Sequence, residues 1–241
     1  MTTRAALVTG ASSGIGLAIA RVLGEAGYGL TLVARRPDRL EAAAAELRDL
    51  GYRVETVPAN VVEDEAVAAV VAHHRDVYGR LDVLVNNAGA GIAGDLAGDY
   101  PLKWLDLQLD VNLRSVILFY REALELLKAA GAEHGNALVV NTSSVAGKQG
   151  ESGLSVYSAA KAGVVAFTQA MNRELEHSGI KSCALCPGFV DTPLSDYIKD
   201  EIPVEEMMRP EDIAEAVRFL IRLSTQCVIT EIVFTRPGDR L

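Results

Sequence analysis

A tyrosine and a lysine one helical turn apart are the residues of this chain best suited to acid–base chemistry. Tyr157 and Lys161 lie four positions apart in a segment with helical periodicity, so their side chains share one face. A phenol has an ordinary pKa of about 10, and a neighbouring ammonium favours the phenolate. Tyr157 is therefore expected to exchange a proton with a substrate oxygen nearer neutral pH.

A serine upstream of this pair is suited to holding that oxygen. Ser144 follows an apolar run with strand character, Ala137 to Asn141, and open α/β sheets bind their ligands at the carboxyl ends of strands. A hydroxyl beside that of Tyr157 would polarise a carbonyl and stabilise the charge that develops on its oxygen. Ser143 is the competing candidate, and either serine could instead form only a turn or a helix cap.

A glycine-rich loop directly follows the first strand-like run and opens a helical segment. Its glycines allow a tight turn that brings backbone N–H groups and the positive end of the helix against a pyrophosphate. The alternative is a turn that merely caps the helix. The candidate phosphate contacts are Gly10, Ser12, Ser13, Gly14, Ile15 and Gly16.

Two arginines end the second strand-like run, where an NAD-specific site would place a carboxylate for the ribose 2′-hydroxyl. Ala34 stands there instead and is followed by Arg35 and Arg36, whose guanidinium groups can pair with a 2′-phosphate. The sequence therefore favours NADP(H) as cofactor. The alternative is that both arginines are solvated surface charges.

Strand-like and helical segments alternate along the whole chain, which predicts right-handed βαβ units and a mainly parallel sheet. We expect one α/β domain over residues 1–241, a doubly wound, Rossmann-type, three-layer αβα sandwich. The expected strands are Ala5 to Val8, Leu30 to Ala34, Arg53 to Pro58, Val83 to Val85, Ala137 to Asn141, Lys181 to Cys186 and Glu231 to Thr235. The expected helices are Gly14 to Gly27, Pro37 to Leu50, Glu63 to Tyr78, Trp104 to Ala130, Tyr157 to Ser178 and Pro210 to Leu223.

One irregular stretch, Thr192 to Arg209, mixes acidic and apolar residues and is expected to form a mobile lid over the substrate. The alternative is a plain surface loop or a short solvated helix.

Composition narrows the class of protein. Of the 241 residues, 49% are apolar and 23% are charged, which is ordinary for a globular protein. A formal net charge of -9 disfavours nucleic acid and anionic membranes as partners. No stretch reaches the roughly 18 apolar residues of a membrane span, and no signal peptide is recognised at the start, so a cytoplasmic protein is expected.

The cysteines and histidines receive no chemical role. Cys183 and Cys186 have the C-x-x-C spacing of metal sites, but residues three apart on a strand point to opposite faces, so no metal is expected. The four histidines match no ligand spacing and are expected at the surface. They are His73, His74, His134 and His177.

Taken together, these motifs resemble the short-chain dehydrogenase/reductase family over nearly the whole chain. The resemblance is carried by Thr9-Gly-x-x-x-Gly-x-Gly16, Asn86-Asn87-Ala88-Gly89, Asn112 in Asp110-Val-Asn-Leu113, Ser144, Tyr157-x-x-x-Lys161 and Pro187-Gly188, in the family's order and spacing.

The resemblance implies a role for each matching residue. Tyr157 is the proton donor or acceptor, Ser144 orients the substrate, and Lys161 binds the nicotinamide ribose and lowers the pKa of the tyrosine. Asn112 carries a water in a proton relay. The remaining implied cofactor contacts are Asn87, Ala88 and Gly89 at the adenosine ribose, Pro187, Val190 and Thr192 at the nicotinamide, and Asn60 and Val61 near the adenine, where many relatives have Asp-Val.

The function expected from residues and resemblance together is hydride transfer between NADP(H) and a small carbonyl or alcohol. The resemblance also suggests a homodimer or homotetramer built partly from the two longest helices. Two alternatives stay open, a reductase of carrier-protein-bound 3-oxoacyl substrates and a cofactor-bound sensor or scaffold without chemistry. The end of the chain, Glu231 to Gly238, departs from the Asp-Gly-Gly turn of many relatives, which leaves subunit contacts and the shape of the substrate pocket open.

Overall fold

Seven parallel strands form one sheet in the computed structural model, which describes residues 4–96 and 98–239. Their order across the sheet is β3-β2-β1-β4-β5-β6-β7. The central strands are buried on both faces, which explains their nearly unbroken apolar sequences. The strands are β1 (Ala5–Thr9), β2 (Gly29–Ala34), β3 (Val54–Pro58), β4 (Val83–Asn86), β5 (Ala137–Thr142), β6 (Ile180–Pro187) and β7 (Glu231–Phe234).

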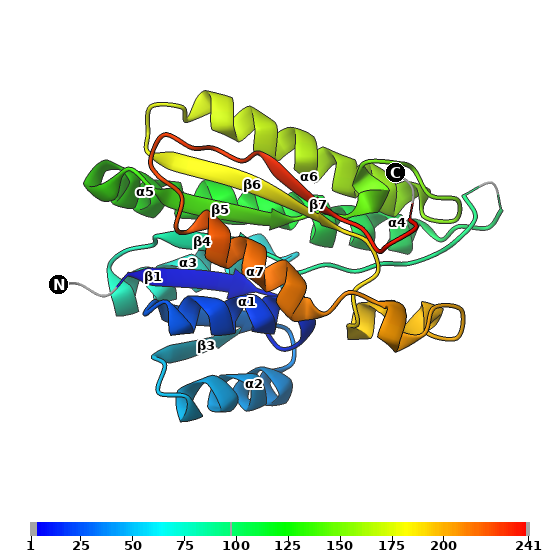
Figure 1. Ribbon diagram of the computed structural model, residues 1–241, viewed down its shortest axis with the longest axis horizontal. Coiled ribbons are helices and arrows are strands. Elements are labelled where there is room, and N and C mark those ends of the chain that lie inside the picture. The colour runs from blue at the N-terminus through cyan, green and yellow to red at the C-terminus, as the bar shows by residue number, and fades with distance from the viewer. Residues whose placement is uncertain (1–3, 97, 240–241) are drawn as a thin grey trace.

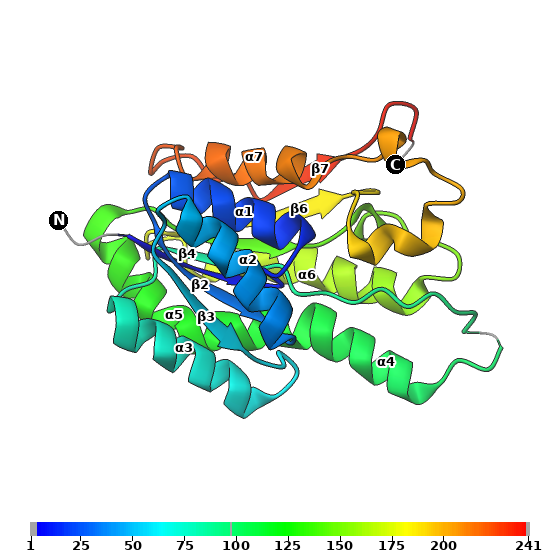
Figure 2. The ribbon, with the colours of Figure 1, turned by 90° about the horizontal axis from the view of Figure 1, so that it is seen from below.

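Helices cover both faces of the sheet (Figures 1 and 2). One face carries α1 (Gly14–Glu25), α2 (Pro37–Asp49) and α7 (Pro210–Leu220). The other carries α3 (Asp64–Tyr78), α4 (Leu102–Leu109), α5 (Ser115–His134) and α6 (Ser155–Glu174). The predicted doubly wound, Rossmann-type fold is confirmed.

The alternation of side chains along each strand divides the core into two layers. Along β6, Cys183 packs in the core beneath α1 and α7, whereas Cys186 packs against Val165 of α6. The two thiols therefore lie on opposite faces of the sheet, as their spacing in a strand predicts. Within the described part of the chain, no group of three or more His, Cys, Asp or Glu side chains could hold a metal ion, and no helix is long and apolar enough to cross a membrane.

The predicted single helix from Trp104 to Ala130 is wrong in one respect. The chain forms α4, then a wide π-helical turn over Asp110–Arg114, then α5, which continues to His134 before Gly135 ends it in the left-handed region. Apolar periodicity predicts helical segments but does not separate an α turn from a π turn. Wide turns of this kind occur often at functional sites.

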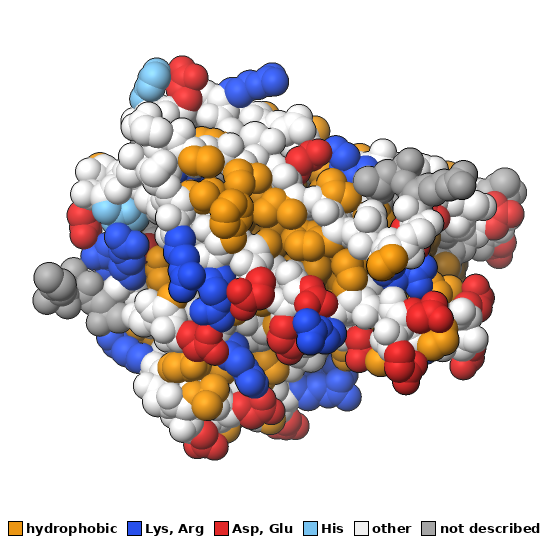
Figure 3. All heavy atoms as spheres, viewed as in Figure 1, with side chains coloured by type: hydrophobic (Ala, Val, Ile, Leu, Met, Phe, Trp, Pro, Cys, Tyr) orange, Lys and Arg blue, Asp and Glu red, His pale blue; other side chains and the backbone are white. Residues whose placement is uncertain are grey.

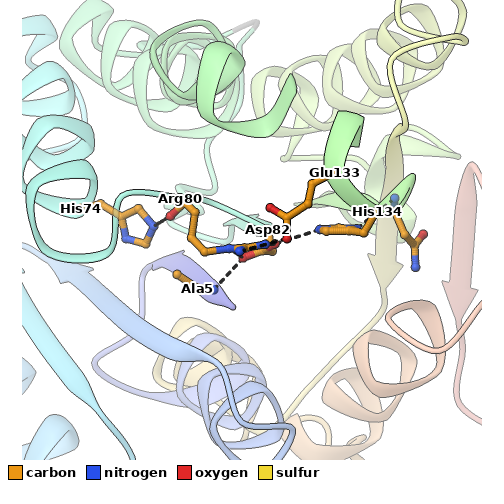
Figure 4. A network of polar contacts seen from close by, with 7 residues as sticks. Ala5, His74, Arg80, Asp82, Glu133 and His134 are labelled. Atoms are coloured by element: carbon orange, nitrogen blue, oxygen red, sulfur yellow. Dashed lines mark hydrogen bonds and ion pairs between the residues drawn. The ribbon is translucent and has the colours of Figure 1, made fainter. Parts of the chain in front are cut away.

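The amino end of the sheet is held by a buried carboxylate (Figure 4). Asp82 accepts hydrogen bonds from the Ala5 N–H at 2.7 Å, from two guanidinium nitrogens of Arg80 and from His134 Nε2 at 2.9 Å. Burial alone would raise the pKa of Asp82, but these donors outweigh it and lower the pKa. Asp82 thus ties β1, β4 and the end of α5 together.

His74, expected at the surface, is instead completely buried between α3 and the sheet. Its Nε2 donates to the Arg80 carbonyl at 2.9 Å, and its Nδ1 accepts from the Thr31 hydroxyl at 2.7 Å. Burial lowers the pKa of His74 to about 4, because a charged imidazole is disfavoured away from water. His134 is also largely covered, since it contacts Asp82.

The buried His74 predicts a loss of stability in mild acid. An unfolded histidine titrates near its ordinary pKa of 6.5, so below that pH the unfolded chain binds more protons than the folded chain. The free energy of unfolding is expected to fall by about 2 kcal/mol between about pH 7 and pH 4.5 through this group alone. Urea unfolding should show a flatter pH dependence for His74→Gln, while the exposed His177→Gln keeps the slope of the parent. Equal slopes for His74→Gln and the parent would contradict the assignment.

Candidate active site

A cleft of about 440 Å³ opens at the carboxyl ends of the strands, where doubly wound sheets bind ligands. Its walls come from segments far apart in the sequence, namely the loops after the first six strands and the start of α6. Among the residues proposed from the sequence, those that line it are Gly10, Ser12, Ser13, Gly14, Ile15, Arg35, Arg36, Val61, Asn87, Ala88, Gly89, Ser143, Ser144, Tyr157, Lys161, Pro187, Val190 and Thr192.

The glycine-rich loop leaves no room for side chains. Gly10 has φ of +65°, and a Cβ there would lie 2.9 Å from the Ala88 Cα. Gly14 has φ of +55°, and a Cβ there would lie 2.9 Å from the Thr192 Cγ2. Both glycines are therefore required by backbone conformation and by close approach. Gly16, where a Cβ would collide with the Gly10 carbonyl, lies beneath the loop and outside the cleft lining.

The amino end of α1 is suited to a pyrophosphate. Ser13 at the N-cap makes no side-chain capping hydrogen bond, and the first turn of the helix contains no acidic residue. The first N–H groups of α1 thus point to the cleft without a capping side chain, and no carboxylate of this turn opposes an anion. The dinucleotide expected from the sequence fits this end of the cleft.

Arg35 and Arg36 extend from the end of β2 at the rim of the cleft. Both are exposed, and neither has an ion pair among the described residues, so their guanidinium groups are available to a phosphate. Val61 lines the cleft nearby, but Asn60 does not, since its amide donates to Glu63 Oε1 at 2.9 Å. The contact of Asn60 with the adenine therefore stays a prediction.

The two candidate serines differ in what their hydroxyls contact. Ser143 is buried, and its hydroxyl donates to the Lys161 carbonyl at 2.7 Å. Ser144 stands at the N-cap of a short 3-10 helix, η2 (Val145–Gly147), where its Oγ accepts from the Ala146 N–H at 3.1 Å and donates to the Pro187 carbonyl at 3.4 Å. Its hydroxyl is also near enough to Tyr157 to lower the pKa of that phenol. Ser144 is therefore the serine placed to share a substrate oxygen with Tyr157.

Lys161 is an almost fully buried ammonium. Its Nζ donates to the Thr142 carbonyl at 2.8 Å and lies 5.6 Å from the centre of the Tyr157 ring. Burial lowers the pKa of Lys161 to about 8, because the charged form loses its hydration. The lysine remains mostly protonated at neutral pH.

The expected lowering of the Tyr157 pKa is wrong for this arrangement. Burial of the hydroxyl raises the pKa of Tyr157 to about 12. The Ser144 hydroxyl lowers this pKa and Tyr197 raises it further, but both effects are smaller than that of burial. The ammonium of Lys161, 5.6 Å from the ring centre, favours the phenolate, but burial of the Tyr157 hydroxyl outweighs its effect. Tyr157 is a protonated phenol at neutral pH and is thus placed to donate a proton.

Asn112 lies in the π turn and outside the cleft lining. Its amide exchanges hydrogen bonds with the Ala90 backbone, 2.7 Å to the carbonyl and 3.1 Å from the N–H, and it also donates to the Gln108 carbonyl. Because these partners occupy the side chain, a water held by Asn112 would bind its main-chain carbonyl. The side chain fixes the loop that follows β4.

Gln108, one helical turn before Asn112, holds the same loop through a second amide, and sequence reasoning missed it. Its buried amide accepts from the Ile92 N–H at 3.2 Å and donates to the Ile92 carbonyl at 3.3 Å, and it also contacts the Tyr100 hydroxyl. The signal was the spacing of two amides four residues apart on one helical face. Together Gln108 and Asn112 hold the loop from Ala90 to Ile92.

Asn87 joins two strand ends beside the cleft. Its amide donates to the Thr9 and Gly10 carbonyls at 3.3 Å, and its Oδ1 accepts from the Thr142 hydroxyl at 3.1 Å. Thr9 also receives the N–H groups of Asn87 and Ala88. The structural role considered for this motif is therefore present, and the cleft-lining position of Asn87 leaves a cofactor contact open.

The segment from Thr192 to Arg209 forms a loop with a closed base and an exposed tip. At the base, Val190 pairs with Met208, and the Ser195 hydroxyl donates to the Val190 carbonyl at 2.7 Å. The loop contains two 3-10 helices, η3 (Pro193–Ile198) and η4 (Val204–Glu206), which sequence patterns did not define. Figure 3 shows acidic side chains gathered over this segment. Its inner residues Thr192, Pro193, Leu194 and Ser195 line the cleft.

Comparison with known proteins places the chain among oxidoreductases. The family model described as short chain dehydrogenase matches residues 4–203. A putative ketoacyl reductase of Streptomyces coelicolor is 38% identical over 239 residues, covering 90% of this chain and 89% of the relative. A cis-4-hydroxycyclohexanecarboxylate dehydrogenase of Sinomonas cyclohexanicum is 37% identical, covering 98% of this chain and 96% of the relative.

A solved structure shares the fold almost throughout. A variant of the actinorhodin polyketide ketoreductase, crystallised with NADPH, matches with a TM-score of 0.86 and 35% identity. The match covers 96% of this chain and 95% of that one.

The amide of Gln108 predicts how the loop after β4 responds to mutation. Gln108→Leu removes the partner of both Ile92 backbone groups, and unpaired buried polar groups cost about 1–3 kcal/mol. We expect a lower free energy of unfolding by about this amount and faster amide hydrogen exchange from Ala90 to Ile92. The exposed Gln226→Leu is the matched control. Unchanged exchange in Gln108→Leu would show that the loop is held by other contacts.

Proposed function

The chain belongs to the short-chain dehydrogenase family, and we propose that it transfers hydride between NADP(H) and a carbonyl or alcohol substrate. The observation that carries this proposal is the convergence of Ser144, Tyr157 and Lys161 on one wall of the cleft whose far end is the glycine-rich loop. A carbonyl between these hydroxyls lies at the carboxyl edge of the sheet, beside the position expected for the nicotinamide. The chain is therefore an enzyme, which disfavours the alternative of a silent scaffold.

The chain's own residues supply the proton chemistry. NADPH, when bound, supplies the hydride that reaches the carbonyl carbon. Tyr157 donates its proton to the carbonyl oxygen, which becomes the alcohol hydroxyl, and Ser144 donates a hydrogen bond to that oxygen as negative charge develops. The ammonium of Lys161 stabilises the phenolate left behind. In the reverse direction the phenolate takes the proton from the alcohol.

The choice of NADP(H) rests on charge at the end of β2. Arg35 and Arg36 line the cleft without carboxylate partners among the described residues, and Ala34 places no negative charge beside a 2′-phosphate. The related ketoreductase crystallised with NADPH supports the same assignment.

A second candidate is the reduction of acyl groups delivered by a carrier protein, because a similar protein is named as a ketoacyl reductase. Carrier proteins are acidic and would need basic side chains near the mouth of the cleft. Near the substrate end of the cleft, Lys148 pairs with Glu231, and Lys199 pairs with Asp191 and Asp196. Arg35 and Arg36, which have no ion pair within the described part of the chain, lie at the cofactor end, where a 2′-phosphate would occupy them. A small free carbonyl compound is the better candidate.

A homo-oligomer in the cytoplasm is the state we propose for the active protein. Support comes from β7, which has a strand neighbour on one side only, and from apolar side chains gathered over β7 and α7 (Figure 3). Phe219 and Val228 in this region are each about half exposed. An edge strand beside apolar surface is suited to pairing with a second copy. The exposed Ile117 on α5 supports a contact through the long helices as well.

The adjacent residues Ser143 and Ser144, together with Tyr157, allow a direct test of which hydroxyls act in catalysis. With NADPH and a panel of ketones and aldehydes, Tyr157→Phe is expected to lower kcat roughly 100- to 10,000-fold and Ser144→Ala about 100-fold. Ser143→Ala should instead lower the free energy of unfolding by about 1 kcal/mol and keep most of the activity. Activity in Tyr157→Phe equal to that of the parent would exclude the mechanism.

The arginine pair gives a test of cofactor choice. Replacing both Arg35 and Arg36 with alanine is expected to weaken NADPH binding by roughly 10- to 100-fold, since two charge-assisted contacts to a phosphate are lost. NADH binding should change little, because that cofactor has no 2′-phosphate. Fluorescence titration of both nucleotides measures the ratio. Tighter binding of NADH than of NADPH by the unmodified protein would contradict the assignment.

A further inference from the structure

A second, smaller pocket of about 130 Å³ is lined by the segment that follows Ser144. Val145, the next residue, lines it, and Gly188 lines both this pocket and the main cleft. The pocket is completed by the segment after β7, where Thr235 and Asp239 contribute. A substrate whose carbonyl oxygen lies between Ser144 and Tyr157 therefore has this pocket available for atoms farther from the carbonyl.

The pocket combines an apolar wall with polar groups. Val145 and Phe189 supply the wall, and the outer face of Phe189 is near the Arg236 guanidinium, 5.6 Å from the ring centre. The side chains of Gln149, Glu151 and Thr235 line the same space and form no hydrogen bonds with other described residues. Such a pocket suits a small apolar skeleton that carries a polar substituent.

Within residues 4–96 and 98–239, the charge of the pocket is negative because the neighbouring cations are already paired. Lys148 lies 2.9 Å from Glu231, and Arg236 lies 2.9 Å from Asp239. The carboxylate of Glu151 has no ion pair in the described part of the chain, so it supplies the unbalanced charge. A cation or a hydrogen-bond donor is favoured there, and a second carboxylate is disfavoured.

The charge of Glu151 is also felt by Tyr197, a residue of the loop that lines the main cleft. The pKa of Tyr197, on η3, is raised first by burial and then by the charge of Glu151. Tyr197 in turn adds to the rise in the pKa of Tyr157.

We propose that this pocket binds the part of the substrate that is remote from the carbonyl, an inference that rests on the proposed carbonyl reduction. Glu151 selects a hydrogen-bond donor in that part of the substrate, either a hydroxyl or an ammonium group. Glu151 is then a specificity-determining residue and not a catalytic one. It disfavours substrates that carry a carboxylate at this position.

Four cyclohexanones that differ only at the carbon opposite the carbonyl test this inference: unsubstituted, hydroxyl, ammonium and carboxylate. With the complete protein and NADPH, kcat/KM is expected to be about tenfold higher for the ammonium than for the carboxylate compound, the combined effect of one favourable and one unfavourable exposed charge pair. Glu151→Gln should bring this ratio near one, and Glu151→Lys should invert it. Added salt should reduce the ratio in the unmodified protein.

Controls separate the pocket from general effects of charge. Glu176→Gln, in the exposed turn after the end of α6, makes the same change in net charge and should keep the parent ratio. The unsubstituted ketone should be reduced equally by all variants. A preference for the hydroxyl compound over the unsubstituted one identifies a hydrogen bond, whereas a preference for the ammonium compound alone identifies charge.

The outcomes distinguish this inference from the proposed function. Reduction of the unsubstituted ketone with a ratio unchanged by Glu151→Gln overturns the inference and leaves the proposed function intact. Turnover of other carbonyls with none of the four ketones reduced also overturns the inference. Absence of turnover with every carbonyl compound overturns both.

Discussion

The burial of one ammonium group is the constraint on which the active site depends. Lys161 loses its hydration between β5 and α6 and is compensated by the Thr142 carbonyl and by its position near the Tyr157 ring. A charge in such a place is tolerated only where its partners are fixed, because an unpaired buried charge costs several kcal/mol. The fully buried strand and the serine that holds the Lys161 carbonyl supply this rigidity.

Buried amides extend this rigidity around the cleft. Asn87 links the ends of β1 and β5, Asn86 hydrogen-bonds Asn141, and Asn112 holds the loop after β4. An amide both donates and accepts, so a single side chain satisfies two backbone groups of a loop that has no sheet partner. The carboxyl end of the sheet is therefore organised by neutral hydrogen bonds, and the amino end by the ion pair of Asp82 with Arg80.

The sequence was sufficient for features that depend on local pattern. The alternation of strands and helices, the glycine loop and the positions of Ser144, Tyr157 and Lys161 follow from spacing and from the geometry of parallel sheets. Features that depend on packing were not accessible. Burial of His74 requires knowing that α3 places it on Thr31, the raised pKa of Tyr157 depends on desolvation, and Asn60 turns to Glu63 through a local contact. The small pocket joins residues more than eighty positions apart.

The wide π-helical turn at Asp110–Arg114 determines how the side chains of α4 are rotated about the helix axis relative to those of α5. Each residue advances an α-helix by about 100°, and a π turn accommodates one residue more than an α turn. Deleting a single residue there would leave both helices intact but would rotate the face of α4 that carries Gln108 away from Ile92. The position of the loop from Ala90 to Ile92 thus depends on the number of residues between Gln108 and α5, as well as on the identity of the two amides that hold it.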